Sequence, residues 1–392
     1  MDKLRLGLIG LGNIGTTHGR YLRKGEVDRC ELVAACDIVP ARLEKFSDLK
    51  TYSDSRELIR SGDVDAVLIG TPHYDHTTIG IDALDNGIHV LVEKPISVHK
   101  ADCERLIAAH NRNLQLGFGA MFQMRTEPLY QRVQGLLDQG ELGEIRRINW
   151  IVTCWYRTEA YYASGGWRAT WKGEGGGVLM NQCPHNLDLF WWFFGMPSRV
   201  RAFCGFGKYH DIETEDEVTA YFEFPNGATG VFVTTTGEAP GSDRLEIAGD
   251  RGRLVVEGGR ITFNRTQVPV SEHLKTSSNA FSPPETWNCE IPYADTPNKG
   301  HAAITRNFVD HVLDGAPLIA PAEQGIHSVE LANAMIYSSL IDDTVELPLD
   351  AAAYEERLKR LIAESRFEKK VSETVASADD FAQSDSTARA RG

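Results

Sequence analysis

A glycine-rich turn near the start of the chain constrains the fold more than any other feature. The apolar run Leu4–Ile9 predicts a strand that is buried on both faces. Gly10, Gly12 and Gly15 follow it with the spacing G-x-G-x-x-G, and the residues through position 24 can form a helix. In such a turn the first glycine permits a sharp bend, the second lets a pyrophosphate approach the backbone, and the third lets helix and strand pack closely. The stretch therefore predicts a dinucleotide-binding turn.

Asp37 closes the next apolar strand, residues 30–37, at about the 20-residue distance from the last glycine that this fingerprint requires. A carboxylate there accepts hydrogen bonds from a ribose 2′-hydroxyl and repels a 2′-phosphate. No arginine follows immediately in Ile38-Val39-Pro40. The sequence therefore predicts NAD rather than NADP. Asp37 is also compatible with a helix N-cap before Pro40.

Strands and helices alternate through the first third of the chain. Further strands are predicted at residues 64–71, 89–94 and 114–119. Helices are predicted between the strands, at residues 41–49, 77–86 and 97–111. The alternation predicts an α/β domain with a doubly wound parallel sheet, whose ligand binds at the carboxyl ends of the strands. We place this domain at residues 1–122.

After residue 119 the pattern changes to strands joined by tight turns. Residues 218–224 alternate apolar and polar side chains, and Pro225-Asn226-Gly227 predicts a hairpin into residues 228–236. Other strands are expected at residues 145–156, 245–248, 253–256, 261–264 and 345–349. Helices are expected at residues 128–139, 301–313, 323–340 and 351–365. We therefore predict a second, α+β domain at residues 123–370, followed by a disordered tail at residues 371–392 that is poor in large apolar side chains.

Charge and composition argue against several classes of partner. The formal net charge of −14 in 392 residues argues against nucleic acid and anionic membranes. We see neither an apolar run that could span a bilayer nor a signal peptide. The seven cysteines are scattered and lack C-x-x-C spacing, so neither a disulfide framework nor a metal site is expected. A cytoplasmic location with reduced thiols is the plain expectation.

Glu93-Lys94-Pro95 lies at the carboxyl end of a predicted parallel strand, where ligands bind in such sheets. A lysine there can hydrogen-bond a substrate oxygen and stabilise developing negative charge. Taken alone, a lysine at a strand end is more often a solvated surface charge.

A second stretch with chemical potential follows the glycines at positions 175–177. Asn181, His185 and Asp188 are spaced four and three apart and share one face if the turn around Pro184 is helical, although Pro184 can instead begin the helix. Histidine is the natural general base near neutral pH, but a single histidine is more often a structural hydrogen-bonding group.

The combination of these motifs resembles the Gfo/Idh/MocA family, the relatives of glucose–fructose oxidoreductase and inositol 2-dehydrogenase. The glycine turn, Thr71-Pro72, Glu93-Lys94-Pro95 and the triple glycine before His185-x-x-Asp188 follow one another in the family's order, and the likeness extends nearly to Lys370. It implies an N-terminal Rossmann domain and a C-terminal domain with a large, mostly antiparallel open sheet that often forms the oligomer interface. It also implies NAD(P)-dependent oxidation of a hydroxyl on a sugar or cyclitol, with Lys94 and His185 as catalytic residues.

Two positions depart from the family pattern. Many relatives carry aspartate four residues before the histidine, where this chain has Asn181. An amide can orient a neighbour but cannot take a proton, so Asp188 is an alternative partner for His185. Relatives often have asparagine where this chain has His73, which is expected to alter contacts to the nicotinamide ribose.

An aromatic and arginine-rich segment lies between the two chemical stretches, at Trp155-Tyr156-Arg157, Tyr161-Tyr162 and Trp167-Arg168. Aromatic faces that stack on sugar C–H groups and forked arginine donors suit a polyhydroxylated ligand. An ordinary core edge or a subunit interface explains any one of these residues equally well.

The expected site follows from these motifs. The expected catalytic residues are Lys94, His185, Asn181 and Asp188. The expected cofactor-binding residues are Gly10, Gly12, Asn13, Ile14, Gly15, Asp37, Thr71, Pro72, His73, His76, Glu93 and Lys94. The expected substrate-binding residues are Lys94, Arg157, Tyr161, Trp167, Arg168, Asn181 and His185.

We expect an NAD-dependent dehydrogenase that oxidises a secondary alcohol of a sugar or cyclitol to a ketone. Two alternatives remain open: an NAD-dependent glycosidase of the same fold, and a non-catalytic dinucleotide-binding regulator. A homodimer or homotetramer is expected, because the strand-rich half has too few helices to cover both faces of a broad sheet.

Overall fold

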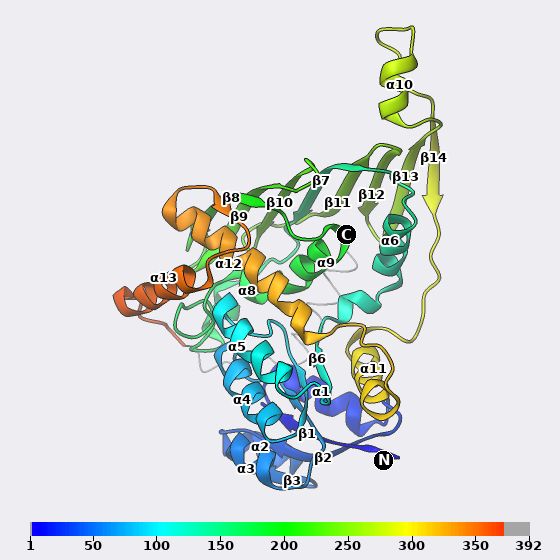
Figure 1. Ribbon diagram of the computed structural model, residues 1–392. Coiled ribbons are helices and arrows are strands. Elements are labelled where there is room, and N and C mark those ends of the chain that lie inside the picture. Colours follow the sequence, from blue (N-terminus) through cyan, green and yellow to red (C-terminus); the bar gives the residue numbers. More distant parts are fainter. Residues whose placement is uncertain (1, 372–392) are drawn as a thin grey trace.

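The first six strands form the parallel sheet that the opening glycine turn predicts (Figure 1). The computed structural model describes residues 2–371. The strands are β1 (Leu4–Ile9), β2 (Cys30–Cys36), β3 (Lys50–Tyr52), β4 (Ala66–Ile69), β5 (His89–Val92) and β6 (Phe118–Ala120). Their order, β3-β2-β1-β4-β5-β6, is that of a Rossmann sheet, and it brings the carboxyl ends of β1 and β4 together at the point where the order reverses.

Five helices accompany this sheet: α1 (Asn13–Arg23), α2 (Pro40–Leu43), α3 (Ser55–Arg60), α4 (His73–Asp85) and α5 (Lys100–Asn111). Several predicted boundaries differ from the structure, and two helices differ most. Helix α4 begins four residues earlier than expected, because His73 and His76 are buried and tertiary packing extends its first turn. The helix predicted at residues 41–49 is only α2, which continues as the 3₁₀ turn Glu44–Phe46.

The second domain is built on a nine-stranded, mostly antiparallel sheet. The hairpin signals predicted such a sheet, but its strands at residues 199–206 and 286–291 were not predicted. Its strands are β7 (Ile145–Val152), β8 (Arg199–Phe206), β9 (Glu215–Glu223), β10 (Thr229–Thr235), β11 (Asp243–Gly249), β12 (Gly252–Glu257), β13 (Arg260–Thr266), β14 (Thr286–Ile291) and β15 (Val345–Glu346). Their order is β14-β13-β12-β11-β7-β10-β9-β8-β15. Strands β7 and β10 are parallel, and the other neighbours that the structure describes are antiparallel.

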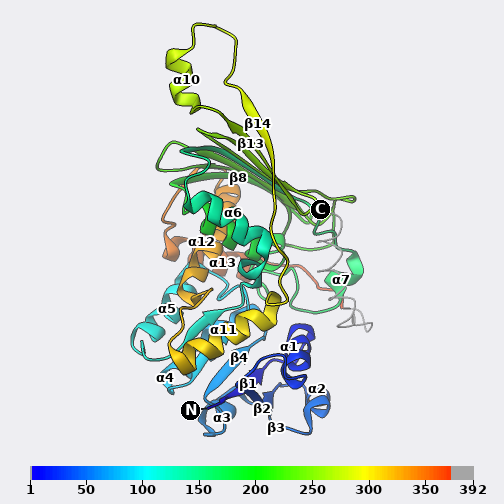
Figure 2. The ribbon, with the colours of Figure 1, turned by 90° about the vertical axis from the view of Figure 1, so that its right-hand side faces the viewer.

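Helices cover one face of this large sheet, on the side that faces the Rossmann domain (Figure 2). They are α6 (Pro128–Asp138), α9 (Pro184–Phe194) and α12 (Gly325–Ile341), with α13 (Ala351–Glu364) beside them. Figures 1 and 2 show no helix of the described chain packed across the opposite face. That face leaves Ile151, Phe203 and Tyr221 exposed, with 61% of Phe203 accessible. We call these three residues the outer-face patch.

Helix α11 (Gly300–Asp314) returns from the second sheet to pack beside the Rossmann strands, next to α1 (Figure 2). The hydroxyls of Tyr21 on α1 and Thr305 on α11 are 2.7 Å apart and buried. Helix α10 (Val270–Thr276), which the sequence pattern did not reveal, stands beyond the sheet at the end of β13 and β14 (Figure 1). Among residues 2–371 we find no helix of the length and apolarity needed to cross a bilayer. The tail predicted at residues 371–392 lies outside the described residues, except for Val371.

Candidate active site

The glycine turn has the geometry that a dinucleotide pyrophosphate needs. Gly10 has a φ of +89°, and a Cβ there would lie 2.7 Å from the backbone of Gly70. A Cβ on Gly15 would lie 1.9 Å from the carbonyl oxygen of Gly10, so helix α1 packs against the turn only because the side chain is absent. Around Gly12, by contrast, no atom lies within 4 Å of such a Cβ. Packing thus demands the outer glycines, whereas open space beside the middle one fits a phosphate at the start of α1.

Asp37 lies at the carboxyl end of β2, almost fully buried beside this turn. One carboxylate oxygen accepts a hydrogen bond from the amide of Leu11 at 2.7 Å, and the other accepts one from the amide of Val39 at 2.8 Å. The guanidinium of Arg42 on α2 lies 3.2 Å from the carboxylate. The acid is therefore fixed where an adenosine ribose binds in a Rossmann domain. Sequence reasoning missed Arg42, which lies two residues after Pro40.

Glu93 is buried and held by protein groups. Its Oε1 lies 2.7 Å from Nε2 of His18, and its Oε2 accepts a hydrogen bond from the Lys94 amide at 3.1 Å. Burial alone would raise its pKa, but the hydrogen bond from His18 and the nearby charges of His18, His301 and Lys94 outweigh it and lower the pKa to about 2. Glu93 therefore holds the turn that presents Lys94, and its expected contact with the cofactor stays a prediction.

The two histidines of α4 are also buried. His76 lies between the carbonyl oxygens of Pro95 and Thr71, at 2.8 and 2.9 Å, and so connects the ends of β4 and β5. Burial lowers the pKa of His76, and burial together with the charges of His76 and Lys94 lowers the pKa of His73 far below its usual value. The ring of His73 lies edge-on to that of Trp167, with centroids 5.5 Å apart. Through this ring contact, His73, an expected cofactor-binding residue, lies next to Trp167, an expected substrate-binding residue.

Lys94 extends from the end of β5 to the second domain. Its Nζ donates a hydrogen bond to the backbone oxygen of Asn181, at 2.8 Å. Asn181 ends the short helix α8 (Val178–Asn181), which follows the glycines at positions 175–177. This glycine-rich stretch is buried and tightly packed; a Cβ on Gly177 would lie 2.0 Å from the carbonyl oxygen of Glu215. The close packing fixes where the lysine meets the second domain.

His185 lies in the first turn of α9, which Pro184 begins. The side-chain nitrogen of Gln123 lies 3.1 Å from its Nε2. Because an amide nitrogen only donates, the contact favours the imidazole form whose Nε2 carries the lone pair, which is the form of a general base. Of the two alternatives that the sequence allowed at Pro184, the structure has the helix start. Gln182 and Cys183 between the two helices keep a right-handed helical backbone, so the turn before Pro184 is nearly helical although α9 begins anew there.

Asp188 forms a buried ion pair instead of orienting His185. Arg125 donates from Nε and Nη2 to the two carboxylate oxygens, at 2.8 and 2.6 Å, and both side chains are 1% exposed. Arg125 comes from the 3₁₀ turn Gln123–Thr126 after β6. The same turn therefore supports His185 through Gln123 and α9 through Arg125. Neither residue was predicted, although both follow the carboxyl end of a Rossmann strand.

The aromatic and arginine residues do gather beside Asn181, as expected. The hydroxyl of Tyr161 on α7 (Glu159–Ala163) donates to Asn181 Oδ1 at 3.3 Å and accepts from Arg168 at 3.0 Å. The guanidinium of Arg168 lies 4.5 Å from the Trp167 ring centroid, and that of Arg157 lies 5.0 Å from the Tyr161 ring centroid. Stacked arginines and aromatic rings form a polar wall with flat apolar faces.

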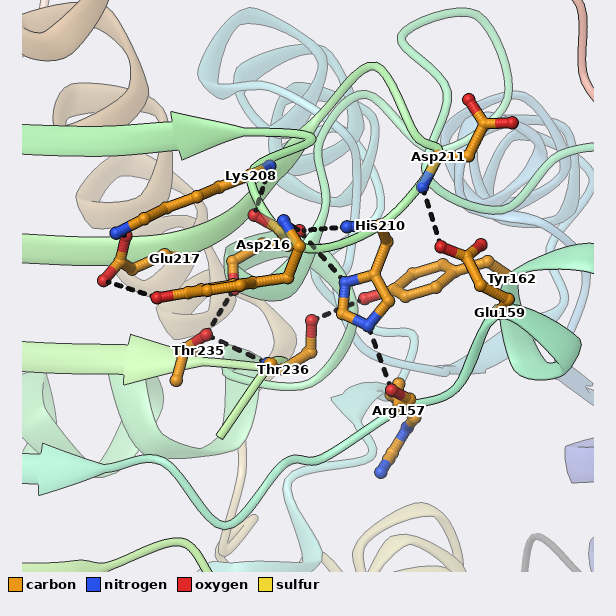
Figure 3. Close-up of polar contacts among 12 residues, drawn as sticks. Arg157, Glu159, Tyr162, Lys208, His210, Asp211, Asp216, Glu217, Thr235 and Thr236 are labelled. Carbon is orange, nitrogen blue, oxygen red and sulfur yellow. Dashed lines mark hydrogen bonds and ion pairs between the residues drawn. The ribbon is translucent and has the colours of Figure 1, made fainter. Parts of the chain in front are cut away.

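The segment that carries these residues is anchored to the loop between β8 and β9 (Figure 3). His210 lies with Nε2 3.0 Å from the carbonyl oxygen of Arg157 and Nδ1 3.0 Å from Asp216. The buried hydroxyl of Tyr162 lies 2.8 Å from that of Thr236. These contacts hold residues 157–162 against the sheet and leave Tyr161 facing Asn181.

The fold and the site together define a class of protein: a two-domain protein with a Rossmann-type dinucleotide-binding fold, in which Lys94 contacts the backbone just before His185. Two sequence models of one family match the chain. The model described as the NAD-binding Rossmann fold of the oxidoreductase family matches residues 4–119, and the Gfo/Idh/MocA C-terminal domain matches residues 130–255. The chain belongs to the Gfo/Idh/MocA family of oxidoreductases.

Individual relatives agree with this assignment. Inositol 2-dehydrogenase of Salmonella typhimurium is 35% identical over 146 residues, which are 36% of this chain and 43% of that enzyme. Trans-1,2-dihydrobenzene-1,2-diol dehydrogenase of Bos taurus is 29% identical over 298 residues, 71% of this chain and 85% of that enzyme. The alignment thus spans less than half the length of the inositol 2-dehydrogenase and most of the length of the diol dehydrogenase.

Among solved structures, the WlbA dehydrogenase of Bordetella pertussis, in complex with NADH and UDP-GlcNAcA, is similar with a TM-score of 0.74 and 26% identity. The match covers 89% of this chain and all of that chain.

Proposed function

We propose that the protein is an NAD-dependent dehydrogenase that oxidises a secondary hydroxyl of a sugar, sugar derivative or cyclitol to a ketone. The observation that carries the proposal is the hydrogen bond from Lys94 to the backbone of Asn181. It brings the lysine at the end of a Rossmann strand to the turn that leads into His185. Relatives named for inositol and for a cyclic diol, and a structural neighbour that holds NADH with a sugar nucleotide, support this substrate class.

The cofactor, when bound, accepts the hydride from the substrate carbon. In the proposed reaction the imidazole of His185 takes the hydroxyl proton, while Lys94 stabilises the negative charge that develops on the oxygen. The wall formed by Tyr161, Trp167 and Arg168 orients the remaining hydroxyls and covers the ring face of the substrate. Gly10, Gly12, Asn13, Ile14, Gly15 and Asp37 hold the dinucleotide, with Thr71 and Pro72 at the nicotinamide end.

A substrate panel tests the proposal directly. Purified protein is incubated with NAD and single cyclitols, sugars or sugar nucleotides, and NADH is followed by its absorbance. We expect one NADH for each substrate molecule oxidised. NADH that fails to accumulate while a glycosidic bond is cleaved would instead establish the glycosidase alternative. Binding of NAD without turnover of any compound would favour the regulatory alternative.

We further propose that the chain forms a homodimer or homotetramer through the outer-face patch, Ile151, Phe203 and Tyr221. Large apolar side chains grouped on an open sheet face support burial against a second copy. The seven cysteines are unpaired thiols, which is compatible with the proposed cytoplasmic location.

A further inference from the structure

Glu174 is a buried carboxylate that lies within the glycine-rich stretch before Asn181. It is 1% exposed, and both of its oxygens accept hydrogen bonds. Oε2 accepts from the amide of Ala169 at 2.5 Å, and Oε1 accepts from the side-chain amide of Asn181. A buried carboxylate needs such donors, because each oxygen that loses water must find a partner.

The contact to Ala169 supports an unusual loop. Ala169 has a φ of +49°, a left-handed conformation that costs energy in a residue with a Cβ. The loop turns back on itself through the hydrogen bond from the Glu174 amide to the Thr170 carbonyl, at 2.9 Å. Trp167 and Arg168, the substrate wall, lie at the start of this loop. Glu174 therefore holds in place the loop that carries Trp167 and Arg168.

The contact to Asn181 fixes the other side of the site. With Nδ2 directed to Glu174, the amide oxygen of Asn181 is left to accept from Tyr161 and from Gln182, at 3.3 and 3.2 Å. Its backbone oxygen accepts from Lys94. Asn181 thus contacts the buried acid and the tyrosine through its side chain, and the lysine through its backbone.

We propose that Glu174 is a positioning residue of the active site, and that Glu174 and Asn181 form an acid–amide pair whose single negative charge must reside on one member only. The proposal deepens the proposed dehydrogenase function and rests on it for its kinetic consequences. A carboxylate at both positions would place lone pairs against lone pairs. With an amide at both positions, one orientation of the new amide at position 174 would place its N–H group against the backbone N–H of Ala169. The opposite orientation would require Asn181 to turn its own N–H group toward the donors of Tyr161 and Gln182. Only one acid and one amide satisfy every partner.

Other charged and titratable groups act on this pair. Arg168 and Lys94 lower the pKa of Glu174, which burial raises, so that the net direction is upward. Lys369 on the C-terminal segment, Glu215 on β9 and Tyr162 on α7 also interact with its charge. His73 on α4 forms a hydrogen bond with the backbone of Glu174. All of these groups remain the same in the variants below, so that differences between variants report on the pair.

The test is a reciprocal exchange. Variants Glu174→Gln and Asn181→Asp are compared with the double variant Glu174→Gln/Asn181→Asp, in which the new amide at position 174 would accept from Ala169 and donate to the new carboxylate at position 181. We expect each single change to lower kcat about tenfold, and the double variant to recover to within about threefold of the unaltered enzyme, as a strongly coupled pair requires. Glu213→Gln is the matched control, because Glu213 supports the same loop at the Trp171 amide, at 2.9 Å, without touching Asn181. Its effect should not be relieved by Asn181→Asp.

A pH profile separates positioning from general support of the fold. In Asn181→Asp, two carboxylates in contact share one proton, which raises the pKa of one of them. Its kcat should therefore fall as pH rises through that pKa, while the double variant lacks this fall. Losses that simply multiply in the double variant, or an Asn181→Asp profile parallel to that of the unaltered enzyme, would overturn the proposal.

Thermal unfolding without substrate gives a second readout that does not depend on turnover. A carboxyl whose pKa is raised on folding stabilises the protein below its unfolded pKa of about 4 and loses that contribution as pH rises. The melting temperature of Asn181→Asp should therefore fall with pH relative to the double variant. A double variant no more stable than Asn181→Asp would refute the pair even if no substrate were oxidised. Failure of the substrate panel alone would count only against the dehydrogenase.

Discussion

The Nζ atom of Lys94 lies 2.8 Å from the backbone oxygen of Asn181, so the residue that ends a Rossmann strand is held by a helix of the second domain. This hydrogen bond links the first domain to the second at Lys94. The hydrogen bond uses the peptide group of Asn181, and its side chain is left for Glu174 and Tyr161. This division explains why an amide at position 181 is compatible with the proposed catalytic role of Lys94.

Replacing the lysine should affect the chemical step more than binding. We expect Lys94→Ala to lower kcat by about 10²–10³-fold with a smaller change in KM, because the lost charge stabilises mainly the transition state. Steady-state kinetics with saturating NAD measure both constants. NADH binding followed by fluorescence serves as the control and should remain within a few-fold. A change confined to KM would place Lys94 in ground-state binding only.

Replacing the histidine should remove the general base. We expect His185→Ala to lower kcat about 10²–10⁴-fold and to flatten the acidic limb of the pH–rate profile. Gln123→Leu keeps the imidazole but removes the amide that donates to Nε2. Because that hydrogen bond favours the neutral ring, its loss should raise the pKa of His185 and move the acidic limb to higher pH. A limb that stays in place in Gln123→Leu contradicts the assigned contact.

Cofactor choice should depend on Asp37. The enzyme should have a higher kcat/KM with NAD than with NADP, and Asp37→Ser should lower the NAD value about tenfold or more while raising the NADP value. Arg42 then becomes free of its carboxylate and can meet a 2′-phosphate. The double change Asp37→Ser/Arg42→Ala should lose the gain with NADP. Preference of the unaltered protein for NADP would disprove this account.

Glu93 should make stability sensitive to acid. Its pKa is about 2 in the folded protein, against an ordinary 4.5, so its contribution is present above pH 4.5 and is lost as pH falls toward 2. The difference corresponds to about 3 kcal/mol. Chemical denaturation at pH 7 and pH 3 should show a larger loss in the unaltered protein than in Glu93→Gln. Equal losses would show that His18 does not favour the charged carboxylate.

The assembly should respond to a charge on the outer-face patch. We expect Phe203→Glu to shift the protein from oligomer to monomer, because burying an unpaired carboxylate in an apolar interface is costly. Light scattering during size-exclusion chromatography measures the mass. Phe281→Glu is the control, since Phe281 is 95% exposed and lies in the loop between α10 and β14 rather than in a strand. A stable monomer of the unaltered protein at micromolar concentration would contradict the proposed oligomer.

Local sequence was sufficient to predict the parts of the candidate site that are formed by consecutive residues. The turn from Gly10 to Gly15 and the positions of Lys94 and His185 follow from short motifs whose geometry is set by the backbone. The partners of the Asp188 and Asn181 side chains, by contrast, could not be predicted from local sequence. Arg125 lies 63 residues before Asp188, and helical spacing carries no information about such a contact.

Two further features of the structure also depend on tertiary packing and were therefore not predicted. Sequence spacing allowed a continuous helix through Pro184, and only packing against the turn at residues 123–126 shows that a new helix begins there. Glu174 was visible within the glycine motif, yet nothing local distinguished a buried acid from a solvated one.

The contact between Tyr21 and Thr305 has a consequence for chimeras made from two members of this family. Helix α11 is encoded far beyond the first domain, yet it covers that domain's strands. A recombination event that joins two parents at residue 122 would unite the first sheet of one parent with the covering helix of the other. Successful chimeras should therefore keep residues 300–314 from the same parent as residues 1–122, and inheritance of these two segments should be linked.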